Sequence, residues 1–231
     1  MLTSIKPKRE KAYAVFPYAC IGRWRFLDLY LTATPYYSEV LERLGNGDIF
    51  LDAGCCFGQV LRQLAFDGAP SNNLRGADLR QEFIDLGYEL FRDRDNFEGQ
   101  FFTGNMLDTT DTALDALNGT VDIIHAASFF HLFGWDDQVK LGERVVKFFK
   151  PDARNAVLLG RQVGNPQPKD HAEHTELGLG RYHHNPETFQ KLWDVIGERT
   201  NTKWKVEGEI IDLIPDSDVP RIGLRFYVHK Q

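Results

Sequence analysis

A short apolar stretch that ends at an acid and runs into a glycine loop constrains this chain more than any other feature. Residues 49–58 read Ile-Phe-Leu-Asp-Ala-Gly-Cys-Cys-Phe-Gly, which predicts a strand over 49–53 and a loop before the next helix. Gly54 and Gly58 permit a tight turn and close approach to a ligand, at the sheet edge where doubly wound folds bind cofactors. A glycine turn that binds nothing is the alternative interpretation.

Apolar runs of strand length alternate with segments of helical periodicity along most of the chain, which is typical of an α/β fold with a mostly parallel sheet. Strands are expected at residues 49–53, 74–78, 100–103, 121–126, 156–160, 204–212 and 222–229. Helices are expected at 34–45 with Thr34 as cap, at 60–65 and 83–91, around a buried stripe of Val139, Val146 and Phe149, and at 185–196 with Asn185 as cap. A polar loop over 161–185 is expected before the last helix.

The length of 231 residues favours a single domain. We expect residues 1–45 to form a helical lid and residues 46–231 to form the core. Crowded aromatic and apolar side chains suggest the lid, since lids exclude water from transfer chemistry, although packing against the sheet edge would explain them equally. These side chains are Tyr13, Phe16, Pro17, Tyr18, Ile21, Trp24 and Phe26. The basic residues Lys6, Lys8, Arg9 and Lys11 are expected to form a solvated arm.

Composition argues against several function classes. The 27 basic and 33 acidic residues give a net charge of −6, which disfavours nucleic acid as a substrate. No apolar run of about 20 residues suits a bilayer span, and the first residues lack the apolar stretch of a signal peptide, so we expect a cytoplasmic protein that does not insert into membranes. The three cysteines fit neither a disulfide framework nor a spaced zinc site. The oligomeric state is not indicated.

The glycine loop favours one kind of nucleoside cofactor over another. A dinucleotide-binding loop would carry a third glycine, in the pattern G-x-G-x-x-G, and little negative charge beside the pyrophosphate. Here the loop has the pattern G-x-x-x-G, and Asp52 stands just before it. S-adenosylmethionine has no phosphate and carries a cationic ammonium and sulfonium, so this acid suits it better.

Two further strand ends carry candidate cofactor ligands. Asp78 ends the second expected strand, where a carboxylate can accept hydrogen bonds from ribose hydroxyls, although a surface turn would also use an aspartate. After the third expected strand, the Asn105 side chain and the Met106 backbone could meet an adenine edge.

In this order and spacing, the three strand ends resemble the class I S-adenosylmethionine-dependent methyltransferases over residues 49–160. Segments 51–59, 76–79 and 128–133 look more narrowly like fungal secondary-metabolite methyltransferases, a group associated with methyl-ester formation on meroterpenoid acids. The resemblance implies a Rossmann-like sheet of seven mostly parallel strands, with helices on both faces and an antiparallel last strand pair. The cofactor contacts that it implies are Asp52, Gly54, Cys55, Gly58, Asp78, Leu79, Asn105, Met106 and Ser128.

Two residues depart from the general pattern of that family. Cys56 stands where many relatives have glycine, and Asn105 stands where many have aspartate. Neither departure disables the site, since the Cβ atom of Cys56 can point away from the ligand and an amide can still accept from the adenine amino group.

Candidate catalytic residues follow the fourth and fifth expected strands. The implied reaction is methyl transfer to a carboxylate or hydroxyl oxygen of a small molecule, in which alignment supplies much of the rate. His131 could orient or deprotonate the acceptor, or could simply pack in the wall. Arg161, expected directly after the fifth strand, could grip a substrate carboxylate, or could be a structural arginine.

Rival interpretations concern a metal site and the reaction itself. His171, Glu173, His174, His183 and His184 have the composition of a metal site, but their loose spacing favours a mobile substrate-facing loop instead, and no metal is expected. The scaffold could also catalyse a cyclisation or isomerisation with retained cofactor, act as a non-catalytic partner of another protein, or, more distantly, be an NAD-dependent reductase. Fold identity alone does not separate these functions.

Overall fold

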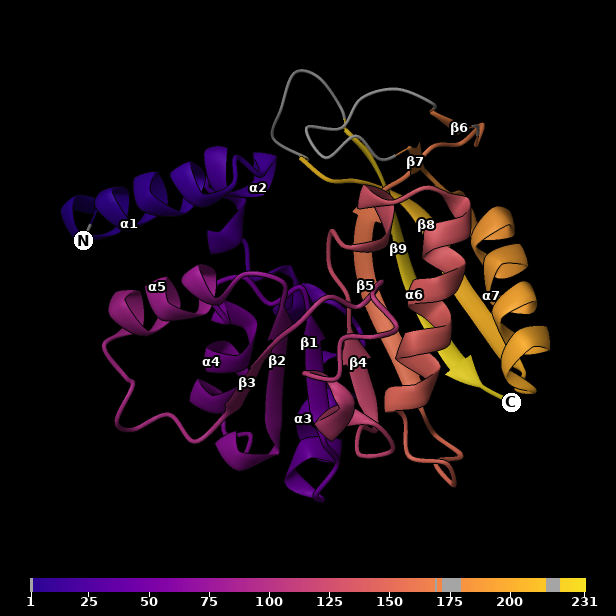
Figure 1. Ribbon diagram of the computed structural model, residues 1–231, viewed down its shortest axis with the longest axis horizontal. Coiled ribbons are helices and arrows are strands. Elements are labelled where there is room, and N and C mark those ends of the chain that lie inside the picture. The colour runs from indigo at the N-terminus through magenta and orange to yellow at the C-terminus, as the bar shows by residue number, and fades with distance from the viewer. Residues whose placement is uncertain (1, 169, 172–179, 215–220) are drawn as a thin grey trace. The chain divides into compact units, whose positions relative to one another are not determined.

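The computed structural model describes residues 2–168, 170–171, 180–214 and 221–231. It divides into two compact units, the first made of Met1–Asn105 with Asp111–Leu114 and the second of Met106–Thr110 with Asp115–Gln231. Seven strands form one sheet in the order β3-β2-β1-β4-β5-β9-β8, as the seven-stranded, mostly parallel prediction requires (Figure 1). In the part of the chain that the structure describes, no helix combines the length and apolar character needed to cross a membrane.

The first unit contains three parallel strands and their connecting helices. Its elements are α1 (Leu2–Val15), α2 (Ala19–Gly22), η1 (Arg25–Leu27), η2 (Tyr30–Ala33), α3 (Tyr37–Gly45), β1 (Phe50–Ala53), α4 (Gln59–Phe66), η3 (Ser71–Asn73), β2 (Leu74–Asp78), α5 (Gln81–Phe91) and β3 (Gln100–Thr103). Strands β1, β2 and β3 pair in parallel, so their carboxyl ends meet at one edge. The predicted strands at 74–78 and 100–103 are confirmed.

The prediction of a solvated N-terminal arm was wrong for Lys8 and Arg9, two of its four basic residues. The predicted arm is part of helix α1, which packs along α5 (Figure 1). Lys8 forms an ion pair with Glu89 of α5, and the Arg9 guanidinium donates hydrogen bonds to the carbonyls of Ile21 and Gly22. A helix carries side chains three and four residues apart on one face, so residues of one turn can bind the neighbouring segments together.

The aromatic N-terminal stretch contributes to a buried cluster. Ile21 is fully buried and Phe26 is 5% exposed, and both pack with Phe57 of the glycine loop and with α5. The Phe26 and Phe57 rings meet edge to face, with centroids 4.9 Å apart. Packing of this kind accounts for Ile21 and Phe26, and a lid function for residues 1–45 stays a prediction.

The predicted helix start at Thr34 was wrong by a few residues. Helix α3 begins at Tyr37, and the Thr34 hydroxyl donates to the carbonyl of Leu31 at 2.7 Å. This local bond closes the preceding turn and competes with capping, as threonine side chains commonly do.

The second unit combines a parallel pair with an antiparallel end to the sheet. Its elements are η4 (Asp115–Leu117), β4 (Ile123–His125), η5 (Phe130–Leu132), α6 (Trp135–Phe148), β5 (Val157–Val163), β6 (Asp170–His171), β7 (Arg181–Tyr182), α7 (Pro186–Thr200), β8 (Trp204–Asp212) and β9 (Ile222–Lys230). Strand β4 pairs with β5 in parallel, and β9 pairs antiparallel with both β5 and β8. Helices α6 and α7 pack on each other, and α7 covers β8 (Figure 1).

Helix boundaries in the second unit both confirm and correct the sequence analysis. The Asn185 side chain caps α7 by accepting from the Thr188 N–H at 2.9 Å, as predicted. The stripe predicted for α6 was partly wrong, because Val146 is only half-buried and Phe149 lies after the helix end. The buried face instead includes Val139, Leu141, Gly142, Val145 and Phe148, which the spacing of about 3.6 residues per turn brings together.

Candidate cofactor and acceptor sites

The glycine loop is built from backbone conformations that few side chains tolerate. Gly54 and Gly58 have φ values of 75° and 64°, in the left-handed region. A Cβ atom at Gly58 would lie 2.7 Å from atoms of the Phe101 and Arg62 side chains. Cys56 also has a positive φ, of 52°, and this explains why glycine would suit its position. The left-handed conformation costs a non-glycine residue about 1 kcal/mol.

Backbone hydrogen bonds attach the loop to strand β2. The N–H groups of Gly54 and Cys55 both donate to the Ala77 carbonyl, at 2.8 and 3.0 Å, and the Gly58 N–H donates to the Cys55 carbonyl at 2.8 Å. Cys55 is 1% exposed, and burial raises the pKa of its thiol. Its N–H and carbonyl both take part in bonds within the protein, so the structure gives Cys55 an evident role in shaping the loop.

Asp78 holds the other side of this loop. Its carboxylate accepts the Cys56 N–H at 2.8 Å and the Arg80 N–H at 3.0 Å. Burial raises the pKa of the Asp78 carboxyl, while these two N–H donors oppose the rise. A carboxylate offers about four lone-pair sites, so further hydrogen bonds from ribose hydroxyls are compatible with the two seen here.

The remaining predicted cofactor residues divide between the units. Asp52 is 4% exposed at β1, and the Leu79 side chain is 51% exposed after β2. The exposed Asn105 donates its N–H to the Asp111 carboxylate at 2.7 Å, which closes the turn after β3. Met106 and Ser128 belong to the second unit.

A long-range side-chain bond, which the sequence analysis missed, organises the loop after β4. Ser128 has a φ of 52° and donates its N–H to the Arg161 carbonyl at 2.7 Å. Three residues later, the His131 N–H donates at 3.2 Å to Oε1 of Gln162, a fully buried side chain. No local pattern marks Gln162, since it lies 31 residues from His131 along the chain.

The prediction that Arg161 directly follows the fifth strand was wrong, because β5 continues to Val163. Its residues pair regularly with β9, with Arg161 opposite Arg225. Successive side chains on a strand point to opposite faces, so Arg161 leaves the sheet on the face opposite to Gln162, the residue that bonds the His131 turn. A role of Arg161 in binding a substrate carboxylate stays a prediction.

The predicted loop of histidines separates into buried and half-buried members. His184 is fully buried between Thr188 and Gln138, with its ring nitrogens 3.1 Å from each. Gln138 Nε2 donates to the carbonyls of Phe133 and Tyr182, both at 2.9 Å, so its oxygen must accept from His184 Nε2–H. Burial lowers the pKa of His184 to about 3, and His184 is therefore a neutral structural residue at ordinary pH.

The other histidines have different surroundings. His183 is half-buried, and its ring centroid lies 6.0 Å from that of His131. Glu173, His174 and the side chain of His171 lie outside the described residues. Among the residues that are described, no group of three or more His, Cys, Asp or Glu side chains is arranged to hold a metal ion.

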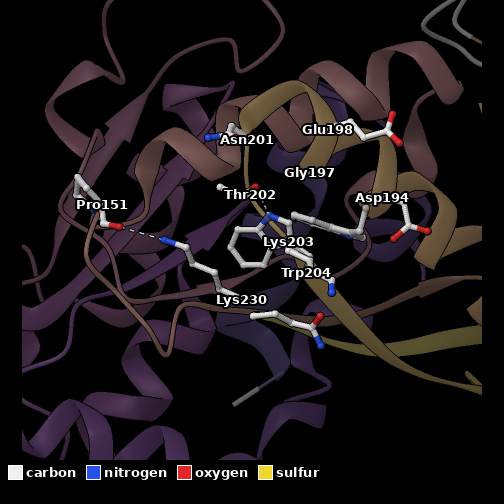
Figure 2. A pocket seen from close by; sticks show the side chains of 11 residues that line it. Pro151, Asp194, Gly197, Glu198, Asn201, Thr202, Lys203, Trp204 and Lys230 are labelled. Atoms are coloured by element: carbon white, nitrogen blue, oxygen red, sulfur yellow. Dashed lines mark hydrogen bonds between the residues drawn. The ribbon is translucent and has the colours of Figure 1, made fainter.

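A shallow hollow of about 940 Å³ lies elsewhere in the second unit, next to Lys203, Trp204 and Pro151 (Figure 2). Lys230 donates to the Pro151 carbonyl across it, at 3.0 Å. Trp204 pairs with Lys230 in the sheet, and the Lys230 N–H donates to the carbonyl of Ala156, the residue before β5. The hollow therefore lies at the amino end of β5. Cofactors in open α/β sheets bind at the carboxyl ends of the strands, so this hollow is not at the end of β5 where a cofactor is expected.

Comparisons with known proteins agree with this arrangement. A family model described as the meroterpenoid methyltransferase N-terminal domain matches residues 3–27, and one described as a methyltransferase domain matches residues 50–152. The chain is 42% identical to the O-methyltransferase phiE of a fungal species, over 87% of this chain and 67% of the relative. It is 38% identical to the methyltransferase adrK of Penicillium roqueforti, over 90% and 74% of the two chains.

A further relative matches along the whole chain. The asnovolin E/chermesin D methyltransferase nvfJ of Aspergillus novofumigatus is 37% identical over 100% of this chain and 83% of its own. Among solved structures, magnesium protoporphyrin IX methyltransferase from Synechocystis, with bound S-adenosylmethionine, gives a TM-score of 0.56 at 11% identity, over 97% of each chain. A methyltransferase from Methanosarcina mazei gives 0.57 at 14% identity, over 79% of this chain and 92% of its own. At such identities the solved structures show the fold alone.

Proposed function

Because the chain belongs to the class I S-adenosylmethionine-dependent methyltransferases, related to the fungal meroterpenoid enzymes, we propose that it methylates a carboxylate or hydroxyl oxygen of a small secondary metabolite. Two relatives carry the name O-methyltransferase, phiE and atr3 of Stereocaulon alpinum, and nvfJ is named for two small molecules. The net charge of −6 argues against a nucleic-acid substrate.

The observation that carries the cofactor part of this proposal is Asp78 at the end of β2. Two backbone N–H groups hold its carboxylate beside the glycine loop and leave capacity for ribose hydroxyls. The residues present therefore fit S-adenosylmethionine, which when bound supplies a methyl group on a sulfonium. We assign Asp78 to the ribose, the backbone between Gly54 and Gly58 to close approach, and Asp52 to the cationic end.

The acceptor side of the proposal rests on the second unit. A carboxylate acceptor needs no general base at neutral pH, because its reference pKa is about 4, whereas a hydroxyl needs one. His131, held by Gln162, is the residue that we assign to the acceptor oxygen.

Calorimetric titration of S-adenosylhomocysteine into wild type and Asp78→Asn tests the cofactor assignment. We expect the variant to bind about 10- to 100-fold more weakly, because charge-assisted hydrogen bonds contribute about 1.5–3 kcal/mol. Asp85→Asn is the matched control, since Asp85 is an exposed carboxylate of α5 that pairs with Arg94. The absence of binding to wild type would refute the proposed function.

The reaction itself is tested by methyl transfer from tritiated S-adenosylmethionine to terpenoid probes that differ in one functional group. Abietic acid offers a carboxylate, abietinol offers a hydroxyl, and methyl abietate offers neither. We expect label to enter the acid or the alcohol, with a product that carries a methyl group in place of one hydrogen, and not the ester. Conversion of a probe to a product of unchanged mass would instead indicate an isomerisation or cyclisation.

A further inference from the structure

We propose that His183 is a second acceptor-binding residue, which together with His131 holds the acceptor oxygen, while Gln162, Gln138 and His184 position the pair. This inference rests on the proposed function and deepens it. Its starting point is the ring geometry, since the two imidazole centroids are 6.0 Å apart with the planes inclined by 55°. Hydrogen bonds of about 2.8 Å from two rings at this spacing can converge on one oxygen atom.

The backbone around His183 is fixed on both sides. The Tyr182 N–H donates to the Phe133 carbonyl at 3.0 Å, and the Asn165 N–H donates to the His184 carbonyl at 2.9 Å. Gln138 bridges the carbonyls of Phe133 and Tyr182, and its oxygen accepts from His184. These hydrogen bonds hold the segment of residues 182–184 in place. They bury His184 and set the position from which His183 faces His131.

His131 is positioned by a different buried group. Gln162 is fully buried, and its oxygen accepts the His131 N–H. Its amide nitrogen has no hydrogen-bond partner among the described residues. Leaving a buried donor unsatisfied is energetically costly, and such groups in native proteins call for an explanation. Both amide atoms are bonded to one carbon, so this unsatisfied donor also lies at the His131 turn, beside the residue that we assign to the acceptor.

Aromatic side chains flank the segments that carry the two histidines. The Trp135 and Tyr182 rings pack on the His184 ring, with centroids 5.7 and 4.7 Å from it, and the Phe129 and Phe133 rings on either side of the His131 turn lie 5.7 Å apart. All four side chains are half-buried rather than sealed in the core. An apolar metabolite with one polar group therefore matches this part of the second unit, with the polar group at the imidazoles.

The histidine pair can assist methyl transfer to either a carboxylate or a hydroxyl. A neutral imidazole carries one N–H donor and one acceptor nitrogen. With a carboxylate, N–H donors hold one oxygen while the other forms the new O–CH₃ bond, the S–CH₃ bond breaks, and its electron pair stays on sulfur. With a hydroxyl, the same bonds form and break, and the hydroxyl proton passes to an imidazole nitrogen. In both cases the histidines fix the acceptor group, and thereby its attacking oxygen, for in-line attack.

We test the pair with the variants His131→Gln and His183→Gln. The control is His229→Gln, which removes an imidazole on β9, outside the proposed site. Histidine-labelled ¹⁵N NMR is recorded during titration with sodium decanoate, and again with decanol. We expect the ring nitrogens of His131 and His183 to shift together, and either site variant to abolish the shift at the remaining histidine. His229 should not respond.

Transfer kinetics on whichever abietic probe is methylated complete the test. We expect His183→Gln to lower kcat/KM about 10- to 100-fold with unchanged S-adenosylhomocysteine affinity, and Gln162→Glu to recover more activity than Gln162→Leu, since a carboxylate can still accept the His131 N–H. The inference is overturned if the ¹⁵N signals of the His183 ring do not shift with either probe, or if His183→Gln has the same kcat/KM as His229→Gln. Failure of wild type to bind S-adenosylhomocysteine would instead overturn the proposed function.

Discussion

The glycine loop of the first unit and the histidine region of the second unit, which contains His131, His183 and His184, are built on different principles. The loop takes its shape from the backbone, through left-handed residues and N–H groups that converge on the Ala77 carbonyl and Asp78. The histidine region takes its shape from side chains, with Gln138 and Gln162 bonding segments far apart along the chain. A backbone-shaped site depends on where glycine is allowed, whereas a side-chain-shaped site depends on long-range partners.

Acidification should affect the histidine region most. The pKa of His184 is about 3 in the folded protein and about 6.5 in the unfolded chain, so the unfolded chain binds more protons between these values. Stability from this group is therefore complete above about pH 6.5 and is lost as the pH falls toward 3, by on the order of 4 kcal/mol. Denaturant unfolding across this range measures the loss.

The variant His184→Gln separates this contribution from those of the carboxyl groups. We expect its unfolding free energy to fall less steeply with acidification than that of wild type, because no imidazole remains to be protonated. Equal slopes for wild type and His184→Gln would show that the buried network does not control acid stability.

A smaller effect is expected where α5 meets the glycine loop. A Cβ atom at Gly87 would lie 2.3 Å from the Phe57 carbonyl oxygen, which is backbone and cannot rotate away. Gly87→Ala should therefore lower the free energy of unfolding by about 1–3 kcal/mol and weaken S-adenosylhomocysteine binding, since the loop must shift.

Gly45→Ala is the matched control for that change. Nothing lies within 4 Å of a Cβ atom at Gly45, the last residue of α3. We expect unchanged or slightly raised stability, because alanine favours helix. If both alanine variants behave alike, close packing at Gly87 does not define the loop.

The smallest effect should come from Cys56→Gly. Removing the side chain relieves the left-handed strain at φ 52°, whereas the greater entropy of glycine in the unfolded chain and the lost packing of Cys56 on the buried cluster around Phe57 oppose this gain. The net change in unfolding free energy should therefore lie within about 1 kcal/mol of zero. Thermal unfolding measures it, and Cys20→Ala controls for loss of a thiol from the same unit. A clear destabilisation would mean that the Cys56 side chain contributes packing that outweighs the strain.

The predicted elements succeeded where the signal was local. Strand β2, the cap at Asn185 and strand β8 lie where the sequence predicts them, because strand alternation and capping depend on residues a few positions apart. The extent of β5 was underestimated, since pairing with β9 extends it through Arg161 to Val163. The site residues proposed from the sequence remain predictions, with Asp78 and the glycine loop the best supported by geometry.

The sequence by itself determined the α/β class and the glycine loop, because these depend on periodicity and on the short-range steric freedom of glycine. The family followed from the resemblance of the three strand-end motifs to known methyltransferases. Only the tertiary structure decided which of two adjacent histidines is buried and neutral, and which faces His131. Adjacent residues of an extended segment point to opposite sides, but which side is covered depends on Gln138, 46 residues away from His184. That choice is made by long-range packing and by the need to satisfy buried polar groups, neither of which is written in the local pattern.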